Sequence, residues 1–236
     1  MKKPYRYELC SPQEADKLMR RVEKNGAENV LSYAESDIVR SFKSEKRRRD
    51  WLAGRLAAKR LLRTGFLMKG NRLSLPEIEI LNHPDGAPYI RLPGVKEYRE
   101  QPLSITHAGN GPIGGAATAE KDTLIGIDIE TNEPRDRSFL ELMAHPSERD
   151  QKFHDDSAEQ TRIWTLKESV SKLLGTGFSV GFWEIRFPVN GTRRLELHGG
   201  AYESWERLGK PVIRFDSFAR DAHIMSIAYT AGDSHA

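Results

Sequence analysis

A short segment near the middle of the chain alternates strictly between apolar and other residues, and this pattern constrains its conformation most. In residues 124–130, isoleucines alternate with Gly126, Asp128 and Glu130. Successive side chains of a β-strand point to opposite faces, so the period of two predicts a strand with its isoleucines buried. Asp128 and Glu130 then share the other face with Gly126, which leaves room beside them. Two carboxylates so close repel each other unless a cation joins them, and oxygen ligands suit Mg²⁺.

A helical pattern begins some thirty residues after this strand. Apolar residues recur at helical spacing over residues 163–174 and form one stripe. Ser157 with Gln160 resembles a capping box at the start, and Gly175 is predicted to end the helix.

The second segment also places three functional side chains on one helical face. Trp164, Glu168 and Lys172 are each four residues apart, so they lie one above another. If that face meets the strand, Glu168 can be a third metal ligand or a base, and Lys172 can hold an anion.

Each segment alone also has a purely structural interpretation. A strand that ends in Asp-x-Glu often runs out into solvent. Glu168 followed by Lys172 is the favoured orientation of a surface ion pair on a helix, worth about 0.3 kcal/mol. The combination, the order and the spacing of the two segments favour a functional site instead.

Together the two segments resemble the signature of the 4′-phosphopantetheinyl transferases of the Sfp type. That family carries a G-[IV]-D-[IV]-E strand and, further along the chain, a [WF]-[SCT]-x-K-E-[SA]-x-x-K helix. Residues 126–130 match the first pattern, and residues 164–172 match every position of the second.

The resemblance extends upstream, with two departures. Residues 47–55 resemble the family's basic segment entering a G-R helix, residues 85–88 its G-K-P turn, and residues 104–107 its I-S-H strand end. Ala87 replaces the family lysine of the turn. Arg48 and Arg49 both qualify as the arginine before the helix, so that position stays open between them.

The resemblance implies roles for the matched residues. Mg²⁺, with Mn²⁺ as an alternative, would be bound by Asp128, Glu130 and Glu168, and Glu168 would also act as the base. Lys172 would stabilise pyrophosphate oxygens, and Lys167 would assist as a mobile cation. Contacts with coenzyme A are implied for a larger set: Arg48, Arg49, Arg55, Thr106, His107, Lys167 and Lys172.

The resemblance also implies the fold, although no internal repeat is evident in the sequence. It implies an α+β fold of two similar halves related by a pseudo-twofold axis, each a long helix packed on a small antiparallel sheet, with the active site between them. Residues 1–117 would hold the basic helix and the coenzyme A contacts, residues 118–236 the metal strand and the catalytic helix, with a linker near Ala119–Thr123. Strand patterns are expected at 75–80, 88–92, 103–106, 182–187, 194–198, 212–215 and 224–229.

Positive charge is concentrated in one segment. From Arg40 to Arg63 there are ten basic and two acidic residues, a net charge of +8, whereas the rest of the chain carries −5. The pattern predicts a helix from Ser44 to Gly65. Such a patch suits phosphates or an acidic partner surface, or is simply the solvated side of an amphipathic helix. Nucleic acid is the weaker functional interpretation, because no aromatic stacking cluster accompanies the charge.

The implied function is transfer of phosphopantetheine from coenzyme A to a serine of an apo acyl, peptidyl or aryl carrier protein, with release of adenosine 3′,5′-bisphosphate. The alternative is a non-catalytic coenzyme A or nucleotide-binding module, because fold and motif do not prove activity. The single cysteine, Cys10, excludes a disulfide framework and suits a reducing compartment. With no signal-peptide pattern and no long apolar run, we expect a cytoplasmic monomer without a membrane or nucleic-acid partner.

Overall fold

The computed structural model describes residues 3–92, 101–108, 113–188 and 194–231. The chain divides into two compact units, unit 1 (Met1–Thr123) and unit 2 (Leu124–Ala236). The division falls at the end of the predicted linker rather than after residue 117, because the last strand of unit 1 continues to Ala119. Within the described residues, no helix is both long enough and apolar enough to cross a membrane.

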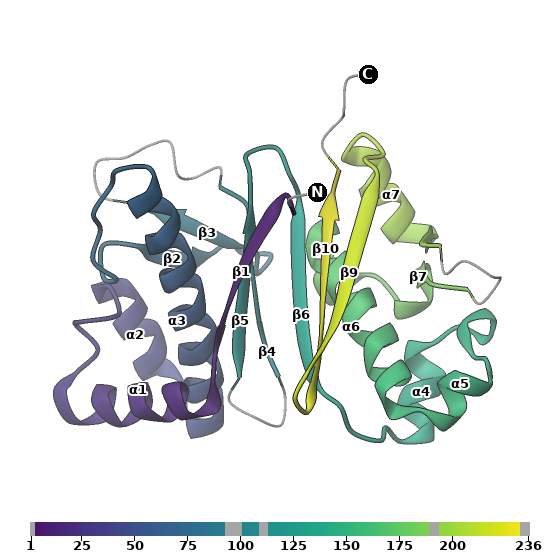
Figure 1. The fold of residues 1–236 in the computed structure, drawn as a ribbon, viewed down its shortest axis with the longest axis horizontal. Coiled ribbons are helices and arrows are strands. Elements are labelled where there is room, and N and C mark those ends of the chain that lie inside the picture. Colours follow the sequence, from purple (N-terminus) through teal and green to yellow (C-terminus); the bar gives the residue numbers. More distant parts are fainter. Residues whose placement is uncertain (1–2, 93–100, 109–112, 189–193, 232–236) are drawn as a thin grey trace. The chain divides into compact units, whose positions relative to one another are not determined.

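Unit 1 is a three-stranded antiparallel sheet with a long helix on it and a separate hairpin (Figure 1). The sheet order is β1-β5-β4, the hairpin pairs β2 with β3, and helix α3 packs against all three strands of the sheet. The elements of unit 1 are β1 (Tyr5–Cys10), α1 (Pro12–Asn25), α2 (Tyr33–Ser41), α3 (Glu45–Met68), β2 (Glu79–Asn82), β3 (Pro88–Arg91), β4 (Leu103–His107) and β5 (Gly114–Ala119).

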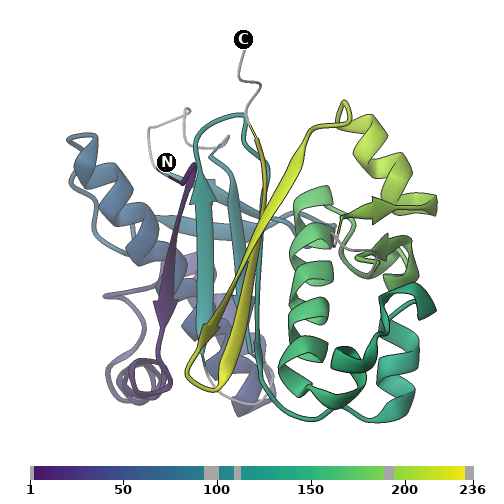
Figure 2. The ribbon, with the colours of Figure 1, turned by 45° about the vertical axis from the view of Figure 1, so that its right-hand side comes forward.

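Unit 2 has the same plan, and Figure 2 shows its long helix α6 lying along its sheet. The sheet order is β6-β10-β9, and the short hairpin pairs β7 with β8. The elements of unit 2 are β6 (Ile125–Thr131), α4 (Arg137–Met143), η2 (Pro146–Glu148), α5 (Gln151–Asp155), α6 (Ser157–Leu174), η3 (Gly177–Ser179), η4 (Phe182–Glu184), β7 (Ile185–Arg186), β8 (Glu196–Leu197), α7 (Gly199–Arg207), β9 (Ile213–Arg220) and β10 (His223–Thr230).

The two units are therefore structural repeats. In each, an edge strand leads through short helices to a long helix, then a hairpin, the other edge strand and finally the central strand. This shared connectivity confirms the predicted α+β fold of two similar halves, each a long helix on a small antiparallel sheet.

The ends of the two long helices follow capping chemistry, with two differences from expectation. Ser44 caps α3 as predicted, accepting a hydrogen bond from the backbone of its third residue at 3.3 Å. Asp156 caps α6 rather than Ser157, because its carboxylate accepts from Ala158 N at 2.8 Å. Gly175 ends α6 in the left-handed region with φ 69°, whereas α3 continues past Gly65.

Most predicted strands are present, and two of the predicted ranges were wrong in part. Of residues 75–80 only the last two belong to β2, because Ile78 N bonds Leu75 O and closes a turn there. Residues 182–187 begin as the short helix η4, and only Ile185–Arg186 pair as β7. The predictions at 88–92, 103–106, 194–198, 212–215 and 224–229 are confirmed within a few residues at each end.

Strand β6 and helix α6 touch backbone to backbone at Gly126. A Cβ added to Gly126 would lie 1.9 Å from Ser169 O and 2.8 Å from Leu173 N. No side chain larger than hydrogen fits there, so glycine sets the spacing between strand and helix. This contact places α6 over the face of β6 that carries Asp128 and Glu130.

Gly126→Ala should therefore destabilise unit 2 by roughly 3 kcal/mol or more, because the helix must move off the strand to admit one methyl group. Chemical denaturation of the variant measures the loss. Gly181→Ala is the matched control: its added Cβ would meet only a side-chain oxygen, at 3.5 Å. Equal stability of Gly126→Ala and the wild-type protein would contradict the close contact.

Candidate active site

Asp128 lies buried between β6 and α6 and is paired with a lysine. Lys172 Nζ lies 2.6 Å from Asp128 Oδ1 and donates a second hydrogen bond to Ile127 O at 3.1 Å. The Asp128 side chain is almost inaccessible, whereas that of Lys172 is 27% exposed. The helix face that carries Lys172 thus meets the strand, as expected, whereas the ion pair of Lys172 with Asp128 was not among the predicted contacts.

Glu130 lies two residues further along β6, on the same face as Asp128, and is close to aromatic rings. Trp164 Nε1 donates to its Oε1 at 3.4 Å, and the Arg135 guanidinium is 3.5 Å from its Oε2. The Trp164 ring in turn packs edge-on against Phe139 and Phe182. Burial raises the pKa of Glu130, and the nearby charge of Asp128 raises it further.

Glu168 is the most perturbed carboxyl group of this site. Burial raises its pKa to about 7; Asp128 and Glu130 add to the rise and Lys172 opposes it. Its side chain projects from α6 one turn before Lys172. The structure therefore brings Asp128, Glu130, Glu168 and Lys172 into one electrostatically coupled group, as the spacing predicts, and a surface ion pair of Glu168 with Lys172 does not describe it.

The carboxylates fit Mg²⁺ in their chemistry, although they do not converge on a point. Among the described residues, no group of three His, Cys, Asp or Glu side chains is arranged to hold a metal ion. All three donors are nevertheless oxygen ligands, and their mutual repulsion is what a divalent cation relieves. The metal site stays a prediction.

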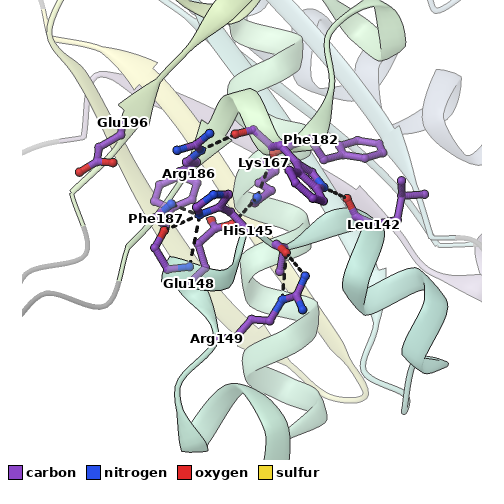
Figure 3. Close-up of polar contacts among 12 residues, drawn as sticks. Leu142, His145, Glu148, Arg149, Lys167, Phe182, Arg186, Phe187 and Glu196 are labelled. Carbon is purple, nitrogen blue, oxygen red and sulfur yellow. Dashed lines mark hydrogen bonds and ion pairs between the residues drawn. The ribbon is translucent and has the colours of Figure 1, made fainter.

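Lys167 occupies a different place from the one predicted for a mobile cation. Its side chain is fully buried, and its ammonium lies 2.6 Å from Glu148 Oε2 and donates to Phe182 O at 2.9 Å (Figure 3). Burial lowers its pKa, and the Glu148 carboxylate opposes this shift. A contact of this ammonium with coenzyme A would require the pair to break. The partner lies nineteen residues away in sequence, so no local pattern indicates it.

In unit 1 the start of α3 forms a pocket of about 430 Å³ with aromatic and cationic walls. The Phe42 and Trp51 rings lie 6.0 Å apart, and the Arg47 guanidinium lies over Phe42 at 4.7 Å. The residues that line it are Phe42, Ser44, Lys46, Arg47, Asp50, Trp51 and His107. His107 was predicted at a binding site, whereas Lys46 and Arg47 were not, although the basic run contained them.

The other residues predicted for coenzyme A lie outside this pocket's lining. Arg49 pairs with Asp16 at 3.1 Å, and Arg48 is half-buried. Arg55 is buried, stacks over Trp51 at 4.8 Å and donates to Asn82, and its burial lowers its pKa to about 10. Thr106 is buried next to the exposed His107.

A larger hollow of about 610 Å³ in unit 2 contains none of the predicted residues. It lies among β8, α7 and β9 and is walled mainly by apolar and aromatic side chains such as Leu197, Trp205 and Phe215. Its size alone does not make it the active site, because the coupled carboxylates lie between β6 and α6.

Comparison with known proteins matches the part of the chain that contains β6 and α6. Residues 124–227 match the family model of the 4′-phosphopantetheinyl transferase superfamily. The holo-[acyl-carrier-protein] synthase of Staphylococcus carnosus is 39% identical over 92 residues, which are 37% of this chain and 73% of that protein. The synthase of Bacillus subtilis is 37% identical over 86 residues, 36% and 69% of the two chains. This chain belongs to the 4′-phosphopantetheinyl transferase superfamily.

Two solved structures from the comparison resemble this one remotely. The complex of the Chronobacterium ammoniagenes synthase with coenzyme A matches 47% of this chain and 98% of its own, with 19% identity and a TM-score of 0.40. The holo-ACP synthase of Plasmodium yoelii matches 98% of this chain and 95% of its own, with 13% identity and a TM-score of 0.29. Likeness at this level adds nothing to the assignment of the site.

The Glu168 carboxyl group should make stability depend on pH in the absence of divalent metal. Its pKa is about 7 in the folded protein and near 4.5 when unfolded, so the folded state holds a proton that the unfolded state has lost between these values. The stability that the protonated Glu168 contributes to folding is therefore fully present below about pH 4.5 and is lost as the pH rises through 7. Glu168→Gln, which keeps the neutral form, should gain on the order of 1–3 kcal/mol over the wild-type protein between pH 5 and pH 8.

Melting temperatures of both proteins across this range, in buffer with chelator, measure the difference. Glu203→Gln, at an exposed carboxylate on α7, is the control and should follow the wild-type curve. Parallel curves for Glu168→Gln and the wild-type protein would contradict the buried, ionisable position of Glu168.

Proposed function

We propose that this protein transfers the 4′-phosphopantetheine group from coenzyme A to a serine of an apo carrier protein and releases adenosine 3′,5′-bisphosphate. Membership of the transferase superfamily supports this reaction, as do relatives named holo-[acyl-carrier-protein] synthase. The observation that carries it is the contact of β6 with α6, where Glu168 is held at a pKa of about 7 beside the Asp128–Lys172 pair.

Glu168 is the group that we assign as general base. The serine oxygen of the carrier attacks the β-phosphorus of coenzyme A, the bond from that phosphorus to the bridging oxygen breaks, and adenosine 3′,5′-bisphosphate leaves with the bridging oxygen. The serine proton passes to Glu168, directly or through a water. A base works best when its pKa is close to the working pH. Burial brings the pKa of Glu168 to about 7 in the metal-free protein, and a bound cation would lower it from there.

Lys172 is the group that we assign to the pyrophosphate. Its ammonium is anchored on Asp128 and Ile127 O, and its side chain is 27% exposed, so a positive charge is held beside the carboxylates at a place that solvent reaches. A cation held in place before the substrate arrives stabilises charge that develops on the leaving phosphate without having to reorganise.

We assign Asp128, Glu130 and Glu168 as the residues that would hold Mg²⁺, or Mn²⁺ in its place. When bound, the metal would neutralise negative charge on the pyrophosphate. The raised pKa values of Glu130 and Glu168 support this set, because the charge of Asp128 adds to the cost of ionising both, and a cation would relieve that cost.

The pocket at the start of α3 is our candidate for the nucleotide part of coenzyme A. Its two aromatic rings offer flat apolar faces, and Lys46, Arg47 and His107 offer donors to phosphate. Arg48, Arg49, Arg55 and Thr106 stay as further proposed contacts of the same basic segment.

We infer further that the chain is of the Sfp type, with an acyl, peptidyl or aryl carrier protein as partner and the cytoplasm as its compartment. The repeat of one topology in both units supports the Sfp type, because the matched relatives align with only about a third to a half of this chain. The second candidate function is a coenzyme A-binding module without turnover.

The test is to incubate the protein with coenzyme A, Mg²⁺ and an apo acyl, peptidyl or aryl carrier protein and to record intact masses. The proposal expects at least one carrier to gain the mass of a phosphopantetheine group, with equal release of adenosine 3′,5′-bisphosphate, and chelator to stop the reaction. Coenzyme A binding without any mass gain would instead support the non-catalytic module.

The basic pocket should act on binding rather than on chemistry. Lys46→Ala with Arg47→Ala should raise the KM for coenzyme A about tenfold at low salt and leave kcat within twofold, because these charges position the substrate and do not react. The effect should shrink as salt rises, since exposed charges are screened over about 8 Å at physiological ionic strength. Arg63→Ala, an exposed cation further along α3, is the control, and an unchanged KM for the double variant would remove the pocket from the proposal.

A further inference from the structure

The fully buried ion pair of Glu148 and Lys167 links helix α6 to two other segments of unit 2. Both side chains have no exposed surface, and Lys167 Nζ lies 2.6 Å from Glu148 Oε2. The same ammonium donates to the backbone oxygen of Phe182, the first residue of η4, at 2.9 Å. Figure 3 shows the two side chains pointing toward each other between these segments.

The carboxylate end of the pair is itself held from several sides. Glu148 Oε2 accepts from His145 N at 2.7 Å, and Oε1 accepts from Phe187 N at 2.7 Å. Arg149 follows directly and donates to Ala144 O at 3.0 Å, so η2 is tied to the end of α4. Lys167 therefore docks α6 on a fixed partner and not on a mobile surface side chain.

Unit 1 contains the same device at the equivalent place. Lys59 on α3 lies 2.6 Å from Glu35 Oε2 with both side chains fully buried, and it donates to Leu75 O and Ile78 O. Glu35 accepts from Ser32 N at 2.8 Å and from Ile80 N at 3.1 Å. In both units the glutamate is the third residue of a short helix before the long one, and a further bond comes from the first strand of the hairpin that follows the long helix, from Ile80 in β2 and from Phe187 directly after β7.

The comparison of the two units shows that the buried ion pair occurs without the functional residues of the site. Counted from the paired lysine, the residues of unit 1 that correspond to Glu168 and Lys172 are Arg60 and Thr64. The buried pair is thus present in a unit whose long helix lacks both functional side chains. Both units contain this lysine in a fully buried ion pair, so a direct contact with substrate does not explain why it is there.

We propose that Glu148 and Lys167 are positioning residues for Glu168, and that they act by setting the rotation and depth of α6 relative to β6. Lys167 and Glu168 are consecutive on the helix, so they point about 100° apart. With Lys167 locked to Glu148 on one side and Lys172 to Asp128 on the other, the direction of Glu168 is set. A misplacement of about 1 Å in a catalytic group can cost on the order of a hundredfold in rate.

The proposal rests on the proposed transferase function, so wild-type transfer is measured first, and its absence would overturn that function rather than the positioning role. The decisive variant is the double replacement Glu148→Gln with Lys167→Met, which removes both charges and leaves no unpaired buried ion. The matched control is Glu35→Gln with Lys59→Met in unit 1. Melting temperature, kcat and the KM for coenzyme A are measured for each.

Both double variants should fold, and their melting temperatures should fall by similar amounts. The unit 2 variant should lose kcat by on the order of 10- to 100-fold with the KM for coenzyme A within twofold, whereas the unit 1 variant should keep its kcat. Wild-type kcat in the folded unit 2 variant, or an equal loss of kcat in both, would overturn the positioning role.

Glu148→Asp provides a second measurement that does not depend on the double variant folding. It keeps both charges but shortens the carboxylate by one methylene, so α6 must shift to keep the pair. The expected result is a lower kcat at an unchanged KM, and Glu35→Asp should again leave kcat alone. An unaltered kcat for Glu148→Asp would count against the proposal.

Discussion

The backbone contact of α6 with β6 at Gly126 is the constraint on which the site depends. Because no side chain separates strand from helix there, Asp128 lies within ion-pair distance of Lys172, and Glu168 is enclosed. Enclosure disfavours the charged form of Glu168, and the pKa of about 7 follows from it. A helix held further away would leave the same residues as ordinary surface charges.

The repeated topology separates what the fold needs from what the chemistry needs. Both units bury one lysine–glutamate pair that docks the long helix on the segments around it. A buried pair of this kind is costly to desolvate and contributes little net stability, but breaking one partner is strongly destabilising, so it favours one arrangement of the helix. The acidic residues beside α3 in unit 1 that pair with its cations include Asp16 and Glu14, whereas α6 in unit 2 meets Asp128 and Glu130 with its own Glu168 beside them, so we place the proposed chemistry in unit 2.

Local patterns predicted the site strand and the site helix well, because both signals are periodic and strong. The alternation of residues 124–130 and the four-residue spacing of Trp164, Glu168 and Lys172 depend only on secondary structure. The structure confirms the strand and the helix, and Trp164 and Lys172 contact Glu130 and Asp128 across them. The same reasoning misassigned the first cap of α6 by one residue, since Asp156 and Ser157 are both good capping residues.

Tertiary contacts were not accessible to the sequence. Glu148, the partner of Lys167, follows a loop and forms part of a single short turn, so nothing nearby marks it as buried. Strand β5 consists of glycine and alanine, which are depleted in strands, with a single threonine, and it forms because β1 and β4 flank it and α3 covers it. The presence of Lys46 and Arg47 in the pocket lining, rather than Arg48 and Arg49, depends on the rotation of α3, which composition does not determine.

A single-turnover transfer assay of Glu168→Gln tests the central claim most directly. Enzyme in excess over an apo carrier protein, with saturating coenzyme A and Mg²⁺, would report the rate of the chemical step by intact mass. Glutamine keeps the size and the helix preference of the residue but cannot accept the serine proton, so the rate should fall on the order of a hundredfold or more while the protein remains folded. A wild-type rate in the folded variant would contradict the assignment of this strand–helix contact as the active site.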